Sequence, residues 1–192
     1  MISMRRRHIS QRGQAVIETA VVFVVLVLLL SGVSAVGGLS DDQNTATTAV
    51  RSGGRFAAEL GNGSSLNLGG STDPWPVDSQ VVSEVCRIMN GMPNLVTIND
   101  VIIYGPQTNS NGSYSASDLH DIYTFTSVPN CTVSLSPTPV KQYTLDLRPT
   151  RHPNEAQVGI LVQYQYRSPT PFFQLNVTAG VYTVVAVSPS FS

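Results

Sequence analysis

The sequence has few charged residues and few of the residue types on which most catalytic sites depend. Only 12% of its 192 residues are charged, and it contains three histidines and two cysteines. His120 is followed directly by Asp121, which is not the spacing of a metal-ligand pair. Glycine-rich phosphate loops, serine nucleophile elbows and metalloprotease helix motifs are all missing from the sequence. We therefore expect no enzyme, no cofactor and no metal site.

Positive charge is scarce once the N-terminus is set aside. Four arginines precede Gly13, which leaves seven of the eleven basic residues against all twelve acidic ones, a net charge of −5. An acidic body binds phosphates poorly, so a nucleic-acid partner is not expected. A basic cluster ahead of an apolar run indicates a cytoplasmic N-terminus and an extracytoplasmic remainder.

The apolar run is long enough to cross a lipid bilayer once. Residues 19–40 carry no charge and form a helix roughly 33 Å long, against a hydrocarbon core of about 30 Å. The span includes Thr19, Ala20, Phe23 and Leu30. The sequence thus predicts a single-pass membrane protein in contact with the lipid bilayer.

Glu18 stands at the cytoplasmic edge of this span, five positions after Gly13. A carboxylate beside or within a membrane helix is unfavourable and is a functional candidate by default. Three interpretations remain open at this point. The segment is an uncut signal anchor, a secretory signal peptide cleaved after Ala35, or a short basic leader cut between Gly13 and Gln14. Only the third interpretation gives Glu18 a role.

The third pattern resembles the prepilin signal of type IV pilin-like proteins. The run Arg-Gly-Gln-Ala-Val-Ile-Glu at residues 12–18 is similar to the start of TadE/TadF-like minor pilins, or pseudopilins, of the tight-adherence (Tad/Flp, type IVc) pilus system. The family usually has Phe or Tyr after the Glu, where this chain has Thr19. A softer resemblance lies in the Ala/Arg/Gly-rich residues 49–58.

The resemblance implies a structural subunit of pilus assembly. A membrane prepilin peptidase would cut the leader, residues 1–13, between Gly13 and Gln14. Glu18 would serve processing, or would pair with the new amino group of a neighbouring subunit. The expected partners are the major pilin and other minor pilins, met through the N-terminal helix, and the inner-membrane pilus assembly platform. The alternatives are a membrane-anchored extracytoplasmic binding or adhesion module and a secreted soluble protein.

Beyond the span at residues 14–40, the pattern predicts a helix extension at 41–60. Small and apolar residues recur there at spacings of three and four, which is typical of an amphipathic helix. Two interpretations of residues 49–58 within this stripe are equally open, namely a subunit-packing face and a surface buried on the chain's own head. Residues 61–77 form a Gly/Ser/Pro-rich loop.

Residues 78–192 are expected to form an extracytoplasmic α+β head, in which an antiparallel β-sheet packs on helix. A short helix is predicted at 78–89. Strands are predicted at 96–104, 121–128, 157–167 and 175–187, the last with a break near Gly180. The two final strands and the proline-containing turn between them also resemble the C-terminal end of TadE-like proteins. Cys86 and Cys131 are predicted to form a disulfide in an oxidising compartment.

Overall fold

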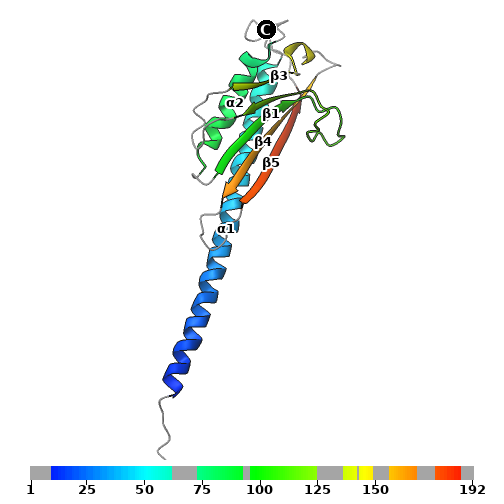
Figure 1. Ribbon diagram of the computed structural model, residues 1–192. Helices are drawn as coiled ribbons and strands as arrows, with labels where there is room; N and C mark the ends of the chain where they lie inside the picture. The colour runs from blue at the N-terminus through cyan, green and yellow to red at the C-terminus, as the bar shows by residue number, and fades with distance from the viewer. Residues whose placement is uncertain are drawn as a thin grey trace, which may run out of the picture.

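The computed structural model combines one very long helix with a small head that contains a second helix and a β-sheet (Figure 1). The structure describes residues 10–61, 73–92, 96–124, 136–141, 143–148, 156–167 and 176–186. Its fold is α+β, as the sequence predicts.

Helix α1 runs without interruption over Ser10–Leu60, a length of 51 residues. Its first part extends well away from the head, and its second part lies along the head (Figure 1). The helical extension and the apolar segment are therefore continuous. A continuous helix satisfies its own backbone hydrogen bonds, which makes it suitable for a lipid environment. The described part of α1 is long and apolar enough to cross a membrane once, with a mean hydropathy of 2.7 in its most apolar stretch.

Helix α2 spans Trp75–Met89 and begins three residues earlier than the sequence predicts. Pro76 lies in its first turn, where a missing backbone N–H leaves no helical hydrogen bond unmade. Trp75 packs against the ring of Tyr123, with the ring centroids 5.8 Å apart. The apolar residues of α2 that face the core are Val77, Val81, Val82, Val85, Cys86 and Met89.

The sheet has five antiparallel strands in the order β3-β2-β1-β4-β5. The strands are β1 (Val96–Tyr104), β2 (His120–Thr124), β3 (Ser136–Lys141), β4 (Gln157–Arg167) and β5 (Asn176–Ala186). A 3₁₀-helix, η2, covers Leu145–Leu147. Both long helices contribute to one apolar core with the sheet, in which Val50 of α1, Val85 of α2 and Ile160 of β4 are fully buried.

Several elements differ from the sequence-based expectation. Strand β5 continues through Gly180, which pairs with Gln163, so the predicted break near Gly180 is wrong. Strand β3 was not predicted, because its sequence Ser-Pro-Thr-Pro-Val-Lys contains two prolines, which are rare in strands except at sheet edges. The predicted residues 125–128 of the second strand lie outside the described residues. Cys131 does too, so its disulfide with the buried Cys86 stays a prediction.

Candidate functional site

The residues expected to act in processing and docking all lie on the exposed first part of α1. Gly13 and Gln14 are in its first turns, and Glu18 follows one turn later, with all three side-chain positions exposed to solvent. The apolar residues that follow are equally uncovered, from Val16 with 68% of its surface exposed to Leu30 with 62%. Such a length of exposed apolar surface requires a lipid or protein environment.

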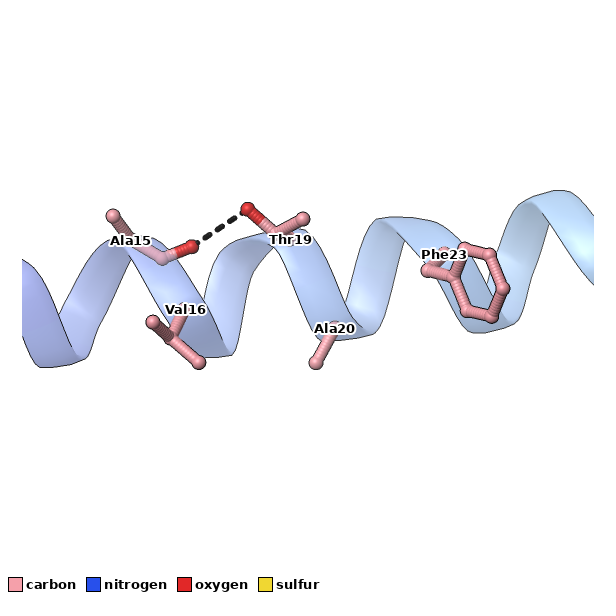
Figure 2. Close-up of a pocket in the computed structure, with 5 residues that line it drawn as sticks. All are labelled: Ala15, Val16, Thr19, Ala20 and Phe23. Atoms are coloured by element: carbon pink, nitrogen blue, oxygen red, sulfur yellow. Dashed lines mark hydrogen bonds between the residues drawn. The ribbon is translucent and has the colours of Figure 1, made fainter.

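Figure 2 shows the helix face around Thr19, the residue that follows Glu18. The Thr19 hydroxyl donates a hydrogen bond of 2.8 Å to the backbone carbonyl of Ala15, one turn earlier. That bond satisfies the hydroxyl within the helix, so Thr19 needs no polar partner in an apolar environment. Ala20 and Phe23 line the same shallow apolar hollow. No function is assigned to that hollow.

Ala35 is the first fully buried residue in the described part of α1, with 5% of its surface exposed. The Tyr166 hydroxyl at the end of β4 donates a hydrogen bond of 3.4 Å to the Ala35 carbonyl. At Gly38 a Cβ atom would lie 3.1 Å from the same hydroxyl, so the glycine allows Tyr166 to lie close against the helix. Contact between α1 and the head thus begins at Ala35 on the face toward Tyr166, while Val36 on another face is still 66% exposed.

Asp42 is the unusual residue of this junction. It is 2% exposed, and its Oδ2 has no hydrogen-bond partner among the described residues, as is also true of the buried Tyr164 hydroxyl. Burial, with a smaller contribution from neighbouring Asp41, raises the pKa of the Asp42 carboxyl. An acid held this way favours its neutral form. The junction thus has a buried carboxyl group that its surroundings do not stabilise as an anion.

The outer part of α1 fits closely into the head through two adjacent glycines. A Cβ at Gly53 would lie 2.5 Å from Val85 of α2, and one at Gly54 would lie 2.9 Å from Thr183 of β5. Each glycine therefore removes a clash on a different side of the helix. Of the two interpretations left open for the stripe at 49–58, the structure favours burial on the chain's own head, because Ala49, Val50 and Ala57 are in the core as well.

A buried ion cluster ties the far parts of the head together. Arg148, just after η2, is 2% exposed and contacts the carboxylates of Asp78 in α2 and Asp121 in β2. The Tyr123 hydroxyl donates a hydrogen bond of 2.6 Å to Asp78, and the Arg148 guanidinium also lies over the Tyr143 ring. Burial raises the pKa of the Tyr143 phenol to about 12.

Sequence reasoning missed this cluster. Arg148 lies in a stretch without helical or strand periodicity, and its partners are 70 and 27 residues away. The only sequence signal was that an arginine, two aspartates and two tyrosines interrupt a head otherwise poor in charge. The cluster is enclosed, with one guanidinium lying between two carboxylates, and it joins α2, β2 and the η2 segment. Among the described residues no three His, Cys, Asp or Glu side chains are grouped as metal ligands would be.

Comparison with known protein families identifies the N-terminal segment. Residues 13–55 match the family model described as TadE-like protein. No curated protein and no solved structure gives a significant match to the chain. The matched residues begin at Gly13, contain Glu18 and Thr19, and end within the part of α1 that is buried on the head. The resemblance inferred from the sequence is thus confirmed over this segment: residues 13–55 are similar to TadE-like proteins.

Proposed function

We propose that the protein is a minor pilin or pseudopilin of the Tad pilus, a structural and assembly subunit rather than an enzyme. The observation that carries the proposal is the uncovered apolar first part of α1, which begins with the Gly13-Gln14 pair and Glu18 and ends where the head begins at Ala35. In this proposal a prepilin peptidase removes residues 1–13, and the helix remaining from Gln14 anchors the subunit in the inner membrane before assembly.

The distance between Glu18 and the head supports a docking role for the carboxylate. Seventeen residues separate Glu18 from Ala35, which amounts to roughly 26 Å of helix at about 1.5 Å per residue. A hydrocarbon core of about 30 Å is longer than that. If the head remains outside the hydrocarbon, Glu18 lies within its cytoplasmic edge, where an unpaired charge is unfavourable.

Leader removal supplies a matching charge. Cleavage before Gln14 creates an amino group one helical turn from Glu18 and gives every neighbouring subunit the same group. Pairing of Glu18 with the amine of an adjacent subunit offsets part of the unfavourable transfer of both charges into lipid. The same interaction sets the vertical register between the two helices. We therefore propose the major pilin and other minor pilins as partners through α1, with the assembly platform acting on the membrane-anchored form.

The alternatives are less well supported. A secreted form cut after Ala35 would separate the helix at a residue that is 95% buried and in contact with Tyr166. A membrane-anchored adhesion module without assembly would leave Glu18 without a role. The proposed orientation has the N-terminus in the cytoplasm and the head outside.

The test is the substitution Glu18→Ala in cells that assemble the pilus. We expect normal membrane insertion and normal protein levels, with piliation strongly reduced. Glu59→Ala is the matched control, because Glu59 is exposed near the end of the same helix, and it should leave piliation unchanged. Normal piliation in the Glu18 variant would refute the docking role.

A further inference from the structure

Strand β5 forms one edge of the sheet and lacks the charges and prolines that often protect an edge, and among the described loops the one at Gly112 approaches it at Val184. Its eleven residues, Asn176–Ala186, contain no charge and no proline. It pairs with β4 along its whole length, and no described strand pairs with its other side. A long, uncharged edge is a template for the addition of another strand. Strand β3, at the opposite edge, is short and carries two prolines and Lys141.

The helix behind β5 adds two positive charges beside this edge. Gly54 faces β5, with the position of its absent Cβ 2.9 Å from Thr183 and 3.1 Å from Val185, whereas Gly53 faces Val85 of α2. Successive residues of a helix are rotated by about 100° about its axis. Measured from Gly54 in the direction opposite to Gly53, Arg51 lies at about 60° and Arg55 at about 100°, so both are on the side of α1 away from α2. Both arginines are exposed, and no ion pair joins either of them to a described residue.

From this juxtaposition we propose that the free edge of β5, flanked by Arg51 and Arg55, binds an extended, acidic segment of another pilus subunit. Backbone hydrogen bonds to β5 would hold the added strand, and its acidic side chains would face the arginines of α1. Two acidic residues at alternate positions of a strand lie about 6.6 Å apart. That spacing matches the rise of about 6 Å between Arg51 and Arg55 along the helix.

A second copy of this chain does not fit the edge. Gly38 of α1 lies against Tyr166, which pairs with Val177 at the start of β5, whereas Gly54 lies against Val185 near its end. Strand β5 therefore runs in the same direction as α1, as Figure 1 also shows. The symmetric pairing of two such edges is antiparallel. It would point the two α1 helices in opposite directions, which two chains anchored alike in one membrane do not allow.

The full chain reconstituted in lipid nanodiscs provides the test, with synthetic eleven-residue peptides as probes. One peptide alternates Val and Thr and carries Glu at two alternate positions, and its counterpart carries Lys at the same two positions. We expect the Glu peptide to bind and to slow amide hydrogen exchange in residues 176–186 by tenfold or more, and the Lys peptide to bind more weakly. Arg51→Ala and Arg55→Ala should each weaken the Glu peptide by about two- to fivefold.

Arg87→Ala is the matched control, because Arg87 is an exposed arginine that pairs with Glu84 on α2, and it should leave peptide binding unchanged. Equal binding of the two peptides, or unchanged exchange in β5, would overturn the proposal. Protection of β5 that grows with chain concentration in the absence of peptide would identify a second copy as the occupant and would also overturn it. The inference rests on the proposed function only in naming the partner a pilus subunit. The peptide experiment needs no pilus. Failure of the peptide to bind would therefore overturn this inference alone, whereas normal piliation of the Glu18→Ala variant would overturn the proposed docking role alone.

Discussion

The guanidinium of Arg148 forms a two-pronged ion pair with the carboxylate of Asp78, 70 residues earlier in the chain. The Nη1–Oδ1 distance is 2.5 Å and the Nη2–Oδ2 distance is 3.1 Å, with both side chains buried. Nη2 also donates a hydrogen bond of 2.7 Å to the carbonyl of Tyr143. The contact connects α2 to the segment before β4.

Replacement of Arg148 should therefore destabilise the head severely. Arg148→Met removes the guanidinium that pairs with the buried carboxylate of Asp78, at a cost of about 3–5 kcal/mol in the free energy of unfolding. Arg148→Lys should rescue only part of this loss, because a single ammonium cannot reproduce the two-pronged geometry. Chemical denaturation in detergent, monitored by Trp75 fluorescence, measures the free energy of unfolding of both Arg148 variants. Arg87→Ala, which breaks an exposed pair, should barely move the unfolding midpoint, and an equally small effect of Arg148→Met would contradict the assigned role.

Gly53→Ala tests the close fit of α1 in the head. The added methyl group would lie 2.5 Å from Val85, so α1 or α2 must shift, at about 1–3 kcal/mol of unfolding free energy. Gly37→Ala is the matched control, since nothing lies within 4 Å of its Cβ position. It should be neutral or slightly stabilising because alanine favours helix. If both variants unfold at the same denaturant concentration, the proposed packing of α1 on α2 is wrong.

Asp42 should make the junction between α1 and the head sensitive to pH. Its pKa is raised in the folded protein, first by burial and then by Asp41, so the folded state holds this proton more tightly than the unfolded state does. Below the unfolded value of about 3.8 the group is neutral in both states and imposes no penalty. As pH rises from there through the folded pKa, the contribution of Asp42 to stability falls and then levels off.

Asp42→Asn should remove this loss and stabilise the protein at pH 7 relative to the unmodified chain. Unfolding free energies measured from pH 3.5 to 7.5 check the prediction, with Glu59→Gln, at an exposed position of the same helix, as the control. A stability difference between Asp42→Asn and the unmodified chain that does not grow with pH would show that Asp42 is ionised without penalty.

The elements with clear periodicity could be predicted from the sequence, and those fixed by long-range contacts could not. Strand β1 and strand β4 follow from β-branched and alternating residues, and the long apolar run predicts the inner part of α1. The glycine pair in α1 lowers helix propensity, yet the helix continues because close packing against Val85 and Thr183 requires small residues there. Strand β3 and the Arg148 cluster have no local signal, since each depends on partners distant in the sequence.

Part of the candidate site could be predicted from the sequence for the same reason. Gly13, Gln14 and Glu18 lie within one short segment, so the resemblance of residues 12–18 to prepilin signals was enough to single them out, and the family match begins at Gly13. The contact between the head and α1 at Ala35 could not be predicted from the sequence, because it is made by Tyr166 of β4, 131 residues later. If the head stays outside the hydrocarbon, this contact would place Glu18 within the cytoplasmic edge of the hydrocarbon rather than beside it.

The most direct test of the account is the N-terminal residue of the mature protein, determined by mass spectrometry of the chain isolated from membranes of the native cell. If the leader is cut between Gly13 and Gln14, we expect Gln14 as the first residue, with residues 1–13 removed and a free amino group. Glu18→Ala and the unmodified chain can be compared in the same measurement to separate processing from docking. A mature chain that starts at Met1 or at Val36 would contradict the assignment as a processed pilin subunit.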